Sequence, residues 1–127
     1  MNTIKRVETG LYYLYDGDEL VYIGSSDSVF ARVGCHSDKT WDHFAVIECG
    51  KDERYILEAR EILEYQPKYN MGVPSNQRYM SKKLLKDALG IDGHAVNHIL
   101  RSVSTWTFRG LIYADIEDCK QKSGGAL

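Results

Sequence analysis

Five side chains in the first half of the chain are of the types that enzymes use to move protons, bind anions and hold cations: Tyr12, Tyr22, Arg32, His36 and Glu58. Histidine exchanges a proton near neutral pH because its unperturbed pKa is about 6.5. Arginine binds an anion through two parallel N–H groups. A carboxylate accepts a proton or holds a hard divalent cation. Each type is common by itself, so any inference depends on order and spacing.

The two tyrosines each belong to a short string with a glycine. Tyr12 closes Gly10-Leu11-Tyr12, and ten residues later Tyr22 opens Tyr22-Ile23-Gly24. Arg32 follows the second string by eight positions, and His36 follows Arg32 by four, which is one turn along the same face of a helix. The glycines are expected to allow close packing and a tight exit from a strand.

The elements that must position this set can be predicted from local patterns. Residues 11–15 and 20–23 are aromatic and β-branched runs joined by Asp16-Gly17, which predicts a β-hairpin. Residues 24–28 end the second strand and offer helix caps, so we expect a helix that contains both Arg32 and His36. A third strand is expected at residues 44–49.

A second helix is predicted from a cap at Asp52 to a stop at Pro67. On this helix Glu64 projects into solvent, while Glu58 is aimed at the edge of the buried stripe. An ionised carboxylate costs several kcal/mol to desolvate unless a cation or donor compensates it. Glu58 therefore either pairs with an arginine such as Arg32, or it has a metal-binding or catalytic role.

The charge of the chain is unevenly distributed. Residues 1–73 hold 8 Lys and Arg against 13 Asp and Glu, whereas residues 74–127 hold 8 against 5. Residues 71–76 are rich in chain-breaking types, and we place a boundary there, giving a first domain at 1–73 and an appendage at 74–127. A polyanion is expected to bind the basic second part.

Composition excludes several classes of protein. A chain of 127 residues, 43% hydrophobic and 27% charged, fits one compact domain with a small appendage and excludes two full-sized domains. The longest uncharged apolar stretch, residues 11–15, is too short to cross a bilayer, and no signal peptide is apparent, so the sequence predicts an intracellular protein without a membrane partner. The 3 cysteines fit neither a disulfide framework nor a zinc site.

Taken in order, these residues resemble the GIY-YIG nuclease family. The resemblance covers residues 10–70 and includes both glycine–tyrosine strings, Arg32 with His36 behind it, Glu58 and the closing string Pro67-Lys68-Tyr69-Asn70. Leu11 stands where the family has isoleucine. Because it has a histidine at position 36, the chain resembles the branch of the family that includes homing and restriction nucleases and structure-specific endonucleases.

This resemblance implies an α/β (α+β) fold, with a small three-stranded antiparallel sheet flanked by helices, and hydrolysis of phosphodiester bonds with one divalent cation, Mg²⁺ or Mn²⁺. Glu58 would be the sole protein ligand of the cation, and Arg32 would bind a phosphate oxygen. Tyr12 is the expected general base, with His36 able to take its proton and Tyr22 holding the water or the base. Which of the three finally accepts the proton stays open.

The remaining residues of the closing string are assigned to DNA. Lys68 is expected to contact the DNA backbone. Asn70 either binds DNA or pins the loop that carries it.

The C-terminal part resembles a helix-turn-helix reader of DNA. Residues 79–103 are predicted to form two helices with Gly90 between them, followed by an extended segment at 106–113. The alternative is a helical hairpin that only completes a core. The residues expected to meet DNA are Arg78, Lys82, Lys83, His94, Asn97, His98 and Arg101.

The leading hypothesis is a metal-dependent DNA endonuclease of phage or mobile-element type, acting on double-stranded DNA in the cytoplasm of a bacterial or phage-infected cell. The alternatives are a repair nuclease that reads DNA structure and a catalytically inactive DNA-binding module. Because one active site cuts one strand, double-strand cleavage requires a homodimer on DNA or sequential nicking.

Overall fold

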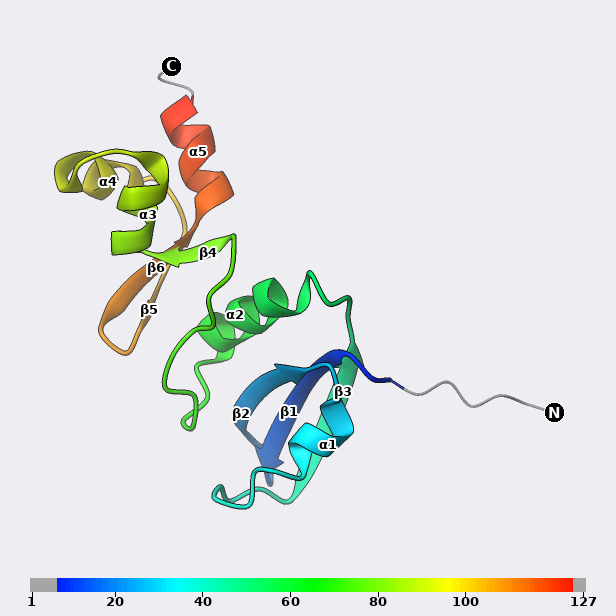
Figure 1. Cartoon of the computed structure of the whole chain (residues 1–127). Helices are drawn as coiled ribbons and strands as arrows, with labels where there is room; N and C mark the ends of the chain where they lie inside the picture. The colour runs from blue at the N-terminus through cyan, green and yellow to red at the C-terminus, as the bar shows by residue number, and fades with distance from the viewer. Residues whose placement is uncertain (1–6, 125–127) are drawn as a thin grey trace. The chain divides into compact units, whose positions relative to one another are not determined.

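The computed structural model describes residues 7–124, and the chain divides into two compact units, Met1–Pro74 and Ser75–Leu127 (Figure 1). Residues 1–6, on which the expectation of no signal peptide rests, lie outside the described residues, as do 125–127. The division falls within the stretch at 71–76 where the sequence places a boundary. The first unit carries β1 (Gly10–Asp16), β2 (Glu19–Ser26), α1 (Val29–Val33), β3 (His43–Glu48) and α2 (Arg54–Tyr65).

The three strands of the first unit form an antiparallel sheet in the order β2-β1-β3, which confirms the predicted sheet. The predicted hairpin turn is also present, since Gly17 has a φ of 61°, a left-handed conformation that glycine adopts without strain. A bulge between Leu14 and Tyr15 makes Val21 an extra residue in β2. Val21 is fully buried in the core with Leu14.

The two helices of this unit cover opposite faces of the sheet. Tyr12 of β1 packs with Val29 and Val33 of α1 in one hydrophobic core. The next residue, Tyr13, donates a hydrogen bond of 2.7 Å to Glu61 of α2. Because neighbouring side chains of a strand point to opposite faces, α1 and α2 must lie on different sides of β1.

Two helix boundaries differ from the sequence prediction. The helix expected to include His36 ends at Val33, and the chain continues through tight turns in which the amide of His36 donates to the carbonyl of Val33 at 3.3 Å. The predicted cap at Asp52 is also wrong, because α2 begins at Arg54 after Glu53, which makes no side-chain cap hydrogen bond. At its other end, α2 stops before Pro67 as predicted, with Gln66 in a left-handed conformation.

The second unit contains more strand than predicted. It comprises β4 (Tyr79–Ser81), α3 (Lys82–Leu89), α4 (Gly93–Leu100), β5 (Thr105–Phe108), β6 (Leu111–Asp115) and α5 (Ile116–Gly124). Its strands form a second antiparallel sheet in the order β4-β6-β5. The prediction of a helix from residue 79 is wrong, because residues 79–81 pair with β6. The extended segment predicted at 106–113 is present as the β5–β6 hairpin.

Two helices of the second unit, α3 and α4, lie where the sequence predicts two, whereas α5 is a helix that the sequence analysis does not predict. Gly90 separates α3 from α4 with a φ of 65°, and the Asp92 side chain caps α4 by accepting from the Ala95 amide at 2.8 Å. Leu85 of α3 and Val96 of α4 are fully buried in one core with Ala114 of β6. This core fixes the two helices against the sheet of their own unit.

Candidate active site

The register of β1 and β2 explains why each tyrosine is accompanied by a glycine. Tyr12 lies directly opposite Gly24 in the antiparallel pair, so that both face the same side of the sheet. A Cβ atom at Gly24 would overlap the phenol ring of Tyr12, and one at Gly10 would overlap the carbonyl oxygen of Ile47 on β3. The close packing expected of these two glycines is present.

Tyr12, Tyr22 and His36 form one aromatic cluster on the α1 side of the sheet. The Tyr12 hydroxyl and the His36 Nε2 atom are hydrogen bonded at 2.7 Å, and both residues are buried. The Tyr22 ring centroid lies 4.7 Å from that of His36 and 6.1 Å from that of Tyr12. The indole of Trp41 donates to the His36 carbonyl at 2.9 Å, which fixes the turn that carries the histidine. The structure thus brings together three of the five predicted residues.

Burial favours the neutral forms of Tyr12 and His36. Burial, followed by the charge of Tyr22, raises the pKa of Tyr12 well above its usual value, although the Arg32 guanidinium beside it acts in the opposite direction. Burial, together with the charges of Lys39 and Arg32, lowers the pKa of His36 below 6.5. A neutral phenol bonded to a neutral imidazole is the expected state. Such a pair can pass on a proton without a charged resting form.

Arg32 is exposed and approaches the cluster from the surface. Hydrogen bonding to the Tyr12 hydroxyl is the main reason that the pKa of Arg32 is raised. The guanidinium is therefore the cation that lies next to Tyr12. The structure does not pair Arg32 with Glu58, which was one of the two possibilities considered for that carboxylate.

A cavity of about 440 Å³ lies beside the aromatic cluster and is formed within the first unit. Tyr22 of β2 and Glu58 of α2 both line it, so two elements that pack on each other bring these predicted residues to one space. Tyr12, Arg32 and His36 do not line it. The rest of its wall consists of Lys39, Tyr69, Asn70, Met71, Gly72, Val73 and Pro74.

Glu58 is half-buried on α2, as the helical spacing predicts, and Glu64 is exposed. The carboxylate accepts a hydrogen bond from the Ser25 hydroxyl. Burial raises the pKa of Glu58, while the Ser25 hydrogen bond and the charge of Arg54, one turn earlier on the helix, act against that rise. A half-buried carboxylate at a cavity wall is less stable as an anion than a surface one, and a bound cation would compensate it.

The donor set at Glu58 fits a particular kind of metal ion. Within residues 7–124, no three His, Cys, Asp or Glu side chains gather in a way that could hold a metal. Such a site does not suit zinc, which takes three or four protein ligands. It suits Mg²⁺, which keeps several waters and is bound through one or two carboxylates together with substrate phosphates.

Asn70 is buried and holds the chain after α2 against the outer edge of β2. Its Oδ1 accepts from the Ile23 amide at 2.9 Å, and its Nδ2 donates to the Ile23 carbonyl at 2.8 Å. The neighbouring Tyr69 amide donates to the Val21 carbonyl at 3.0 Å. These contacts are those of a loop-pinning residue that also fixes one wall of the cavity. Lys68 is exposed, with its Nζ 3.7 Å from Glu19.

Two residues of the site were missed by the sequence analysis. Lys39 lines the cavity, and Ser25 donates to Glu58. Ser25 follows Gly24 directly, and its place on the α2 face of β2 could have been inferred from strand alternation. Lys39 lies three residues after His36 in an irregular loop, where no periodicity indicates the direction of a side chain.

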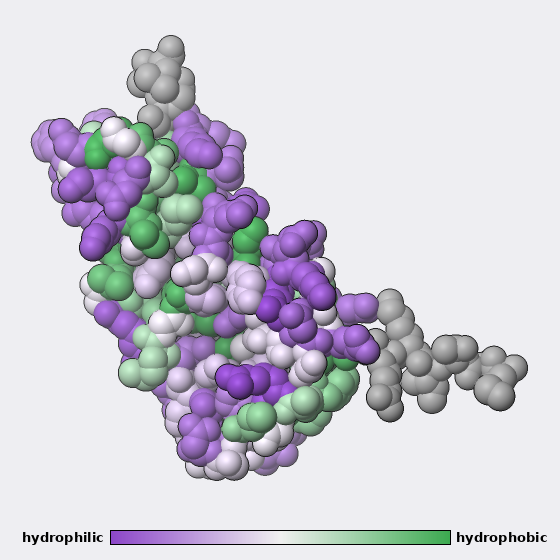
Figure 2. Space-filling view, in the orientation of Figure 1, coloured by the Kyte–Doolittle hydropathy of each residue, from purple (hydrophilic) through white to green (hydrophobic). Residues whose placement is uncertain are grey.

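The basic and polar residues predicted to meet DNA lie in different environments in the second unit. His94, Asn97 and His98 are exposed on α4, and Arg101 is exposed at its C-terminal cap. Figure 2 shows hydrophilic residues gathered over the α3 and α4 part of this unit. Lys83 is exposed on α3 and Lys82 is half-buried. Arg78 is engaged within the unit, since its Nε donates to Asp115 at 3.0 Å.

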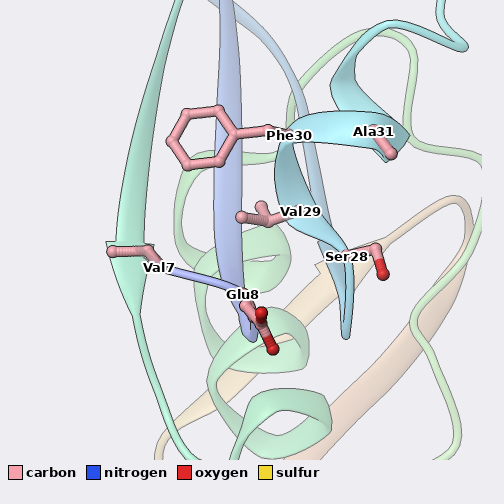
Figure 3. Close-up of a pocket in the computed structure, with 6 residues that line it drawn as sticks. All are labelled: Val7, Glu8, Ser28, Val29, Phe30 and Ala31. Carbon is pink, nitrogen blue, oxygen red and sulfur yellow. The ribbon is translucent and has the colours of Figure 1, made fainter. Parts of the chain in front are cut away.

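A separate cavity of about 260 Å³ lies at the start of α1 (Figure 3). In Figure 3, Phe30 projects from α1 across the sheet, with Val7 and Val29 nearby. The lining contains one titratable group, Glu8, and none of the predicted site residues. The cavity beside Tyr22 and Glu58 is accordingly the candidate active site.

Two solved structures are similar to this chain. Both are crystal structures of the GIY-YIG N-terminal endonuclease domain of UvrC from Thermotoga maritima bound to its catalytic divalent cation. The magnesium-bound one is 28% identical, with a TM-score of 0.45, over 51% of this chain and 85% of that chain. The other, a point mutant, is 26% identical, with a TM-score of 0.46, over 52% and 86%. Neither a protein-family model nor a curated protein matches the chain. Among residues 7–124, no helix has the length and apolar character needed to cross a membrane.

Proposed function

We propose that this protein is a divalent-metal-dependent endonuclease of the GIY-YIG type that hydrolyses phosphodiester bonds in DNA. The observation that carries the proposal is the cavity that Tyr22 and Glu58 share, with the hydrogen-bonded Tyr12 and His36 directly behind Tyr22. A carboxylate for a cation, a phenol for a water molecule and a neutral imidazole for a proton are the groups that this hydrolysis requires.

Glu58 would hold the cation, which when bound absorbs negative charge on the phosphoryl oxygens. Tyr22 lines the cavity and Tyr12 does not, so we assign the Tyr22 hydroxyl to accept a hydrogen bond from the attacking water. Tyr12 is almost fully buried, with 1% of its surface exposed, and its ring centroid lies 6.1 Å from that of Tyr22. We therefore assign Tyr12 to the path of the proton and Tyr22 to contact with water.

We assign the proton of the attacking water to a path through Tyr22 and Tyr12 to His36. As the water oxygen bonds to phosphorus and the bond from phosphorus to the leaving oxygen breaks, a water proton passes to Tyr22, the Tyr22 proton to Tyr12, and the Tyr12 proton to His36 Nε2. The leaving oxygen takes its proton from solvent water, and the hydroxide formed is neutralised when the imidazolium later returns its proton to solvent. The imidazole ends as a cation, and neither phenol has to exist as an anion. This path explains why a tyrosine with a raised pKa can still take part in base catalysis.

We further propose that the second unit binds double-stranded DNA as a helix-turn-helix-like module through α4. The exposed side chains on that helix support this role, as does the excess of basic residues in 74–127. The proposed setting is the cytoplasm of a bacterial or phage-infected cell, with a homing or restriction role. A homodimer on DNA, or two successive nicks, would cut both strands.

Incubation with plasmid, single-stranded and branched DNA, each with Mg²⁺ or with EDTA, tests the proposal. Cleavage of plasmid at one sequence, only with Mg²⁺, supports the homing or restriction role. Cutting confined to branched DNA assigns the protein to repair instead. Binding without cleavage under Mg²⁺ or Mn²⁺ would show an inactive DNA-binding module.

A further inference from the structure

Lys39 is the basic residue among those that line the candidate active site. It lies in the loop between α1 and β3, and its backbone amide donates to the His36 carbonyl at 3.3 Å. The position of the lysine is therefore tied to that of the histidine. It shares the cavity wall with Glu58, whose carboxylate would repel a DNA phosphate unless cations offset it.

The side chain of Lys39 is held in place by its packing. It is only 15% exposed, and its Nζ lies 4.8 Å from the centroid of the Tyr22 ring. The aliphatic stem is thus covered, while the ammonium lies against the aromatic residue that faces the cavity. A lysine ordered in this way loses less entropy on binding an anion than one that is free in solvent.

The present partner of Lys39 is easily replaced. Its Nζ lies 3.3 Å from each carboxylate oxygen of Asp38, whose side chain is 73% exposed. An ion pair whose carboxylate is exposed contributes little to stability, because water solvates that carboxylate nearly as well as the ammonium does. A phosphate that enters the cavity can therefore take the ammonium from Asp38 at little cost.

Arg32, the cation expected from the sequence to bind phosphate, is placed differently. The Tyr12 hydroxyl is the main cause of the raised pKa of Arg32, and Arg32 is not part of the cavity wall. The two cations are thus next to different groups: Arg32 beside the buried tyrosine, and Lys39 beside the tyrosine that meets substrate.

We infer that Lys39 binds a non-bridging oxygen of the scissile phosphate in the cavity that it shares with Glu58. This assignment rests on the proposed nuclease function and adds a phosphate-binding residue to it. The ammonium exchanges Asp38 for the phosphate and keeps all its covalent bonds. Because charge on that oxygen grows as the water attacks, the contact is strongest in the transition state.

The test uses the full chain and three variants: Lys39→Met, Lys39→Arg and, as a matched control, Lys51→Met, which changes an exposed lysine outside the cavity. Single-turnover cleavage of double-stranded DNA with Mg²⁺ is measured over a range of protein concentrations. We expect Lys39→Met to lower the maximal rate by about 100-fold, as for loss of one donor to a developing oxyanion. We expect Lys39→Arg to recover part of the rate and Lys51→Met to leave it unchanged.

A binding measurement separates this inference from the proposed function. Inorganic phosphate is titrated into ¹⁵N- and ¹³C-labelled protein without metal, and the NMR signals of Tyr22 and Lys39 are followed. Shifts that saturate in the parent and in Lys51→Met, and that are absent in Lys39→Met, support the assignment even if the protein cuts no DNA. Unchanged cleavage in Lys39→Met overturns it, as does weaker DNA binding at an unchanged maximal rate. Failure of phosphate to perturb the parent protein also overturns it.

Discussion

His36 and Asn70 of the first unit and the polar residues of α4 in the second unit lie in opposite environments. In the first unit His36 and Asn70 are each 4% exposed and bonded to groups of the same unit. In the second unit the histidines and the asparagine of α4 are exposed. The net charge of the two parts also differs, since residues 1–73 carry a net −5 and residues 74–127 a net +3.

This contrast corresponds to two different requirements, those of catalysis and those of DNA binding. Burial fixes the orientation of a side chain and shifts its pKa, which catalysis requires, but it costs free energy unless every polar atom is satisfied. Exposure leaves a side chain free to meet a polyanion, and long-range attraction needs no fixed geometry. Substitutions of the same residue type in the two units should therefore have different consequences.

The largest effect is expected from Glu58→Gln, which keeps the shape of the side chain and removes the charge that would hold the cation. We expect cleavage to fall by about 10³-fold or more, corresponding to several kcal/mol of transition-state stabilisation. DNA binding should be retained, because the exposed groups of the second unit are untouched. Cleavage assays and fluorescence anisotropy on one DNA duplex measure the two properties separately.

Glu64→Gln is the matched control for this substitution, since Glu64 is exposed on the same helix. It should leave the cleavage rate unchanged. Turnover that persists in the Glu58 variant would count directly against that residue as the metal ligand. Loss of DNA binding in the same variant would show that the two units do not divide the work as proposed.

A pair of asparagine substitutions compares the units in terms of stability. Asn70→Ala removes two buried hydrogen bonds and leaves the amide and carbonyl of Ile23 without these partners, so we expect a loss of about 2–3 kcal/mol. Asn97→Ala changes an exposed residue of α4 and should alter stability by no more than about 0.5 kcal/mol. Urea denaturation gives the free energies of unfolding, and hydrogen exchange at the Ile23 amide locates the first loss.

For DNA affinity we expect the reverse order: Asn97→Ala should weaken DNA binding more than Asn70→Ala does. If Asn70→Ala leaves both the unfolding free energy and the exchange of the Ile23 amide unchanged, the two hydrogen bonds do not hold this loop. Asn70 would then be available to bind DNA, as the sequence analysis first allowed.

Much of the first unit could be predicted because its signals are local. The hairpin follows from two β-rich runs around Gly17, and the half-buried position of Glu58 follows from helical spacing. The role of Gly24 also follows, once strand pairing sets it against the ring of Tyr12. In each case the residue type and its neighbours in sequence carry the physical cause.

The features that could not be predicted depend on contacts between distant residues. The end of α1 at Val33 is marked in the sequence by Gly34, but that glycine keeps a helical φ of −65° and tight turns continue the chain to His36. Lys39 lies in an irregular loop, with its Nζ 4.8 Å from the centroid of the Tyr22 ring. The strand at residues 79–81 is only three residues long and is recognisable through its pairing with β6, which lies some thirty residues later. Sequence periodicity cannot predict a pairing between strands so far apart in the chain.

The third expected effect concerns pH. The proton path needs His36 neutral, and its pKa is lowered by burial first and then by Lys39 and Arg32, with Asp38 acting in the opposite direction. Tyr12 and Tyr22 are the other titratable groups that face the ring. Cleavage should therefore become independent of this group as the pH rises above 6.5, and should fall tenfold per pH unit below the His36 pKa.

The lowered pKa of His36 also affects the free energy of unfolding. A histidine with a lowered pKa in the folded state contributes stability that is present above pH 6.5 and is lost as the pH falls through the folded pKa. NMR titration of the imidazole ring gives that pKa directly, and His36→Gln should remove this part of the pH dependence of unfolding. A measured pKa above 6.5 would contradict the neutral Tyr12–His36 pair.

The smallest effect is expected from Arg101→Ala, at the exposed end of α4. Loss of one phosphate contact should weaken DNA binding by severalfold, corresponding to about 1 kcal/mol, and should lower the slope of log affinity against log salt by about 1. The cleavage rate at saturating protein should not change, because no group of the cavity is altered.

Lys120→Ala decides whether that effect is local. Lys120 carries the same charge in the same unit, but it lies on α5, 3.7 Å from Glu117. If α4 is the element that meets DNA, the Lys120 variant should keep both the affinity and the salt slope of the parent protein, even though the net charge has changed equally. Equal weakening by both substitutions would mean that the second unit attracts DNA through its overall charge, and the exposure of side chains on α4 would then have no particular meaning for recognition.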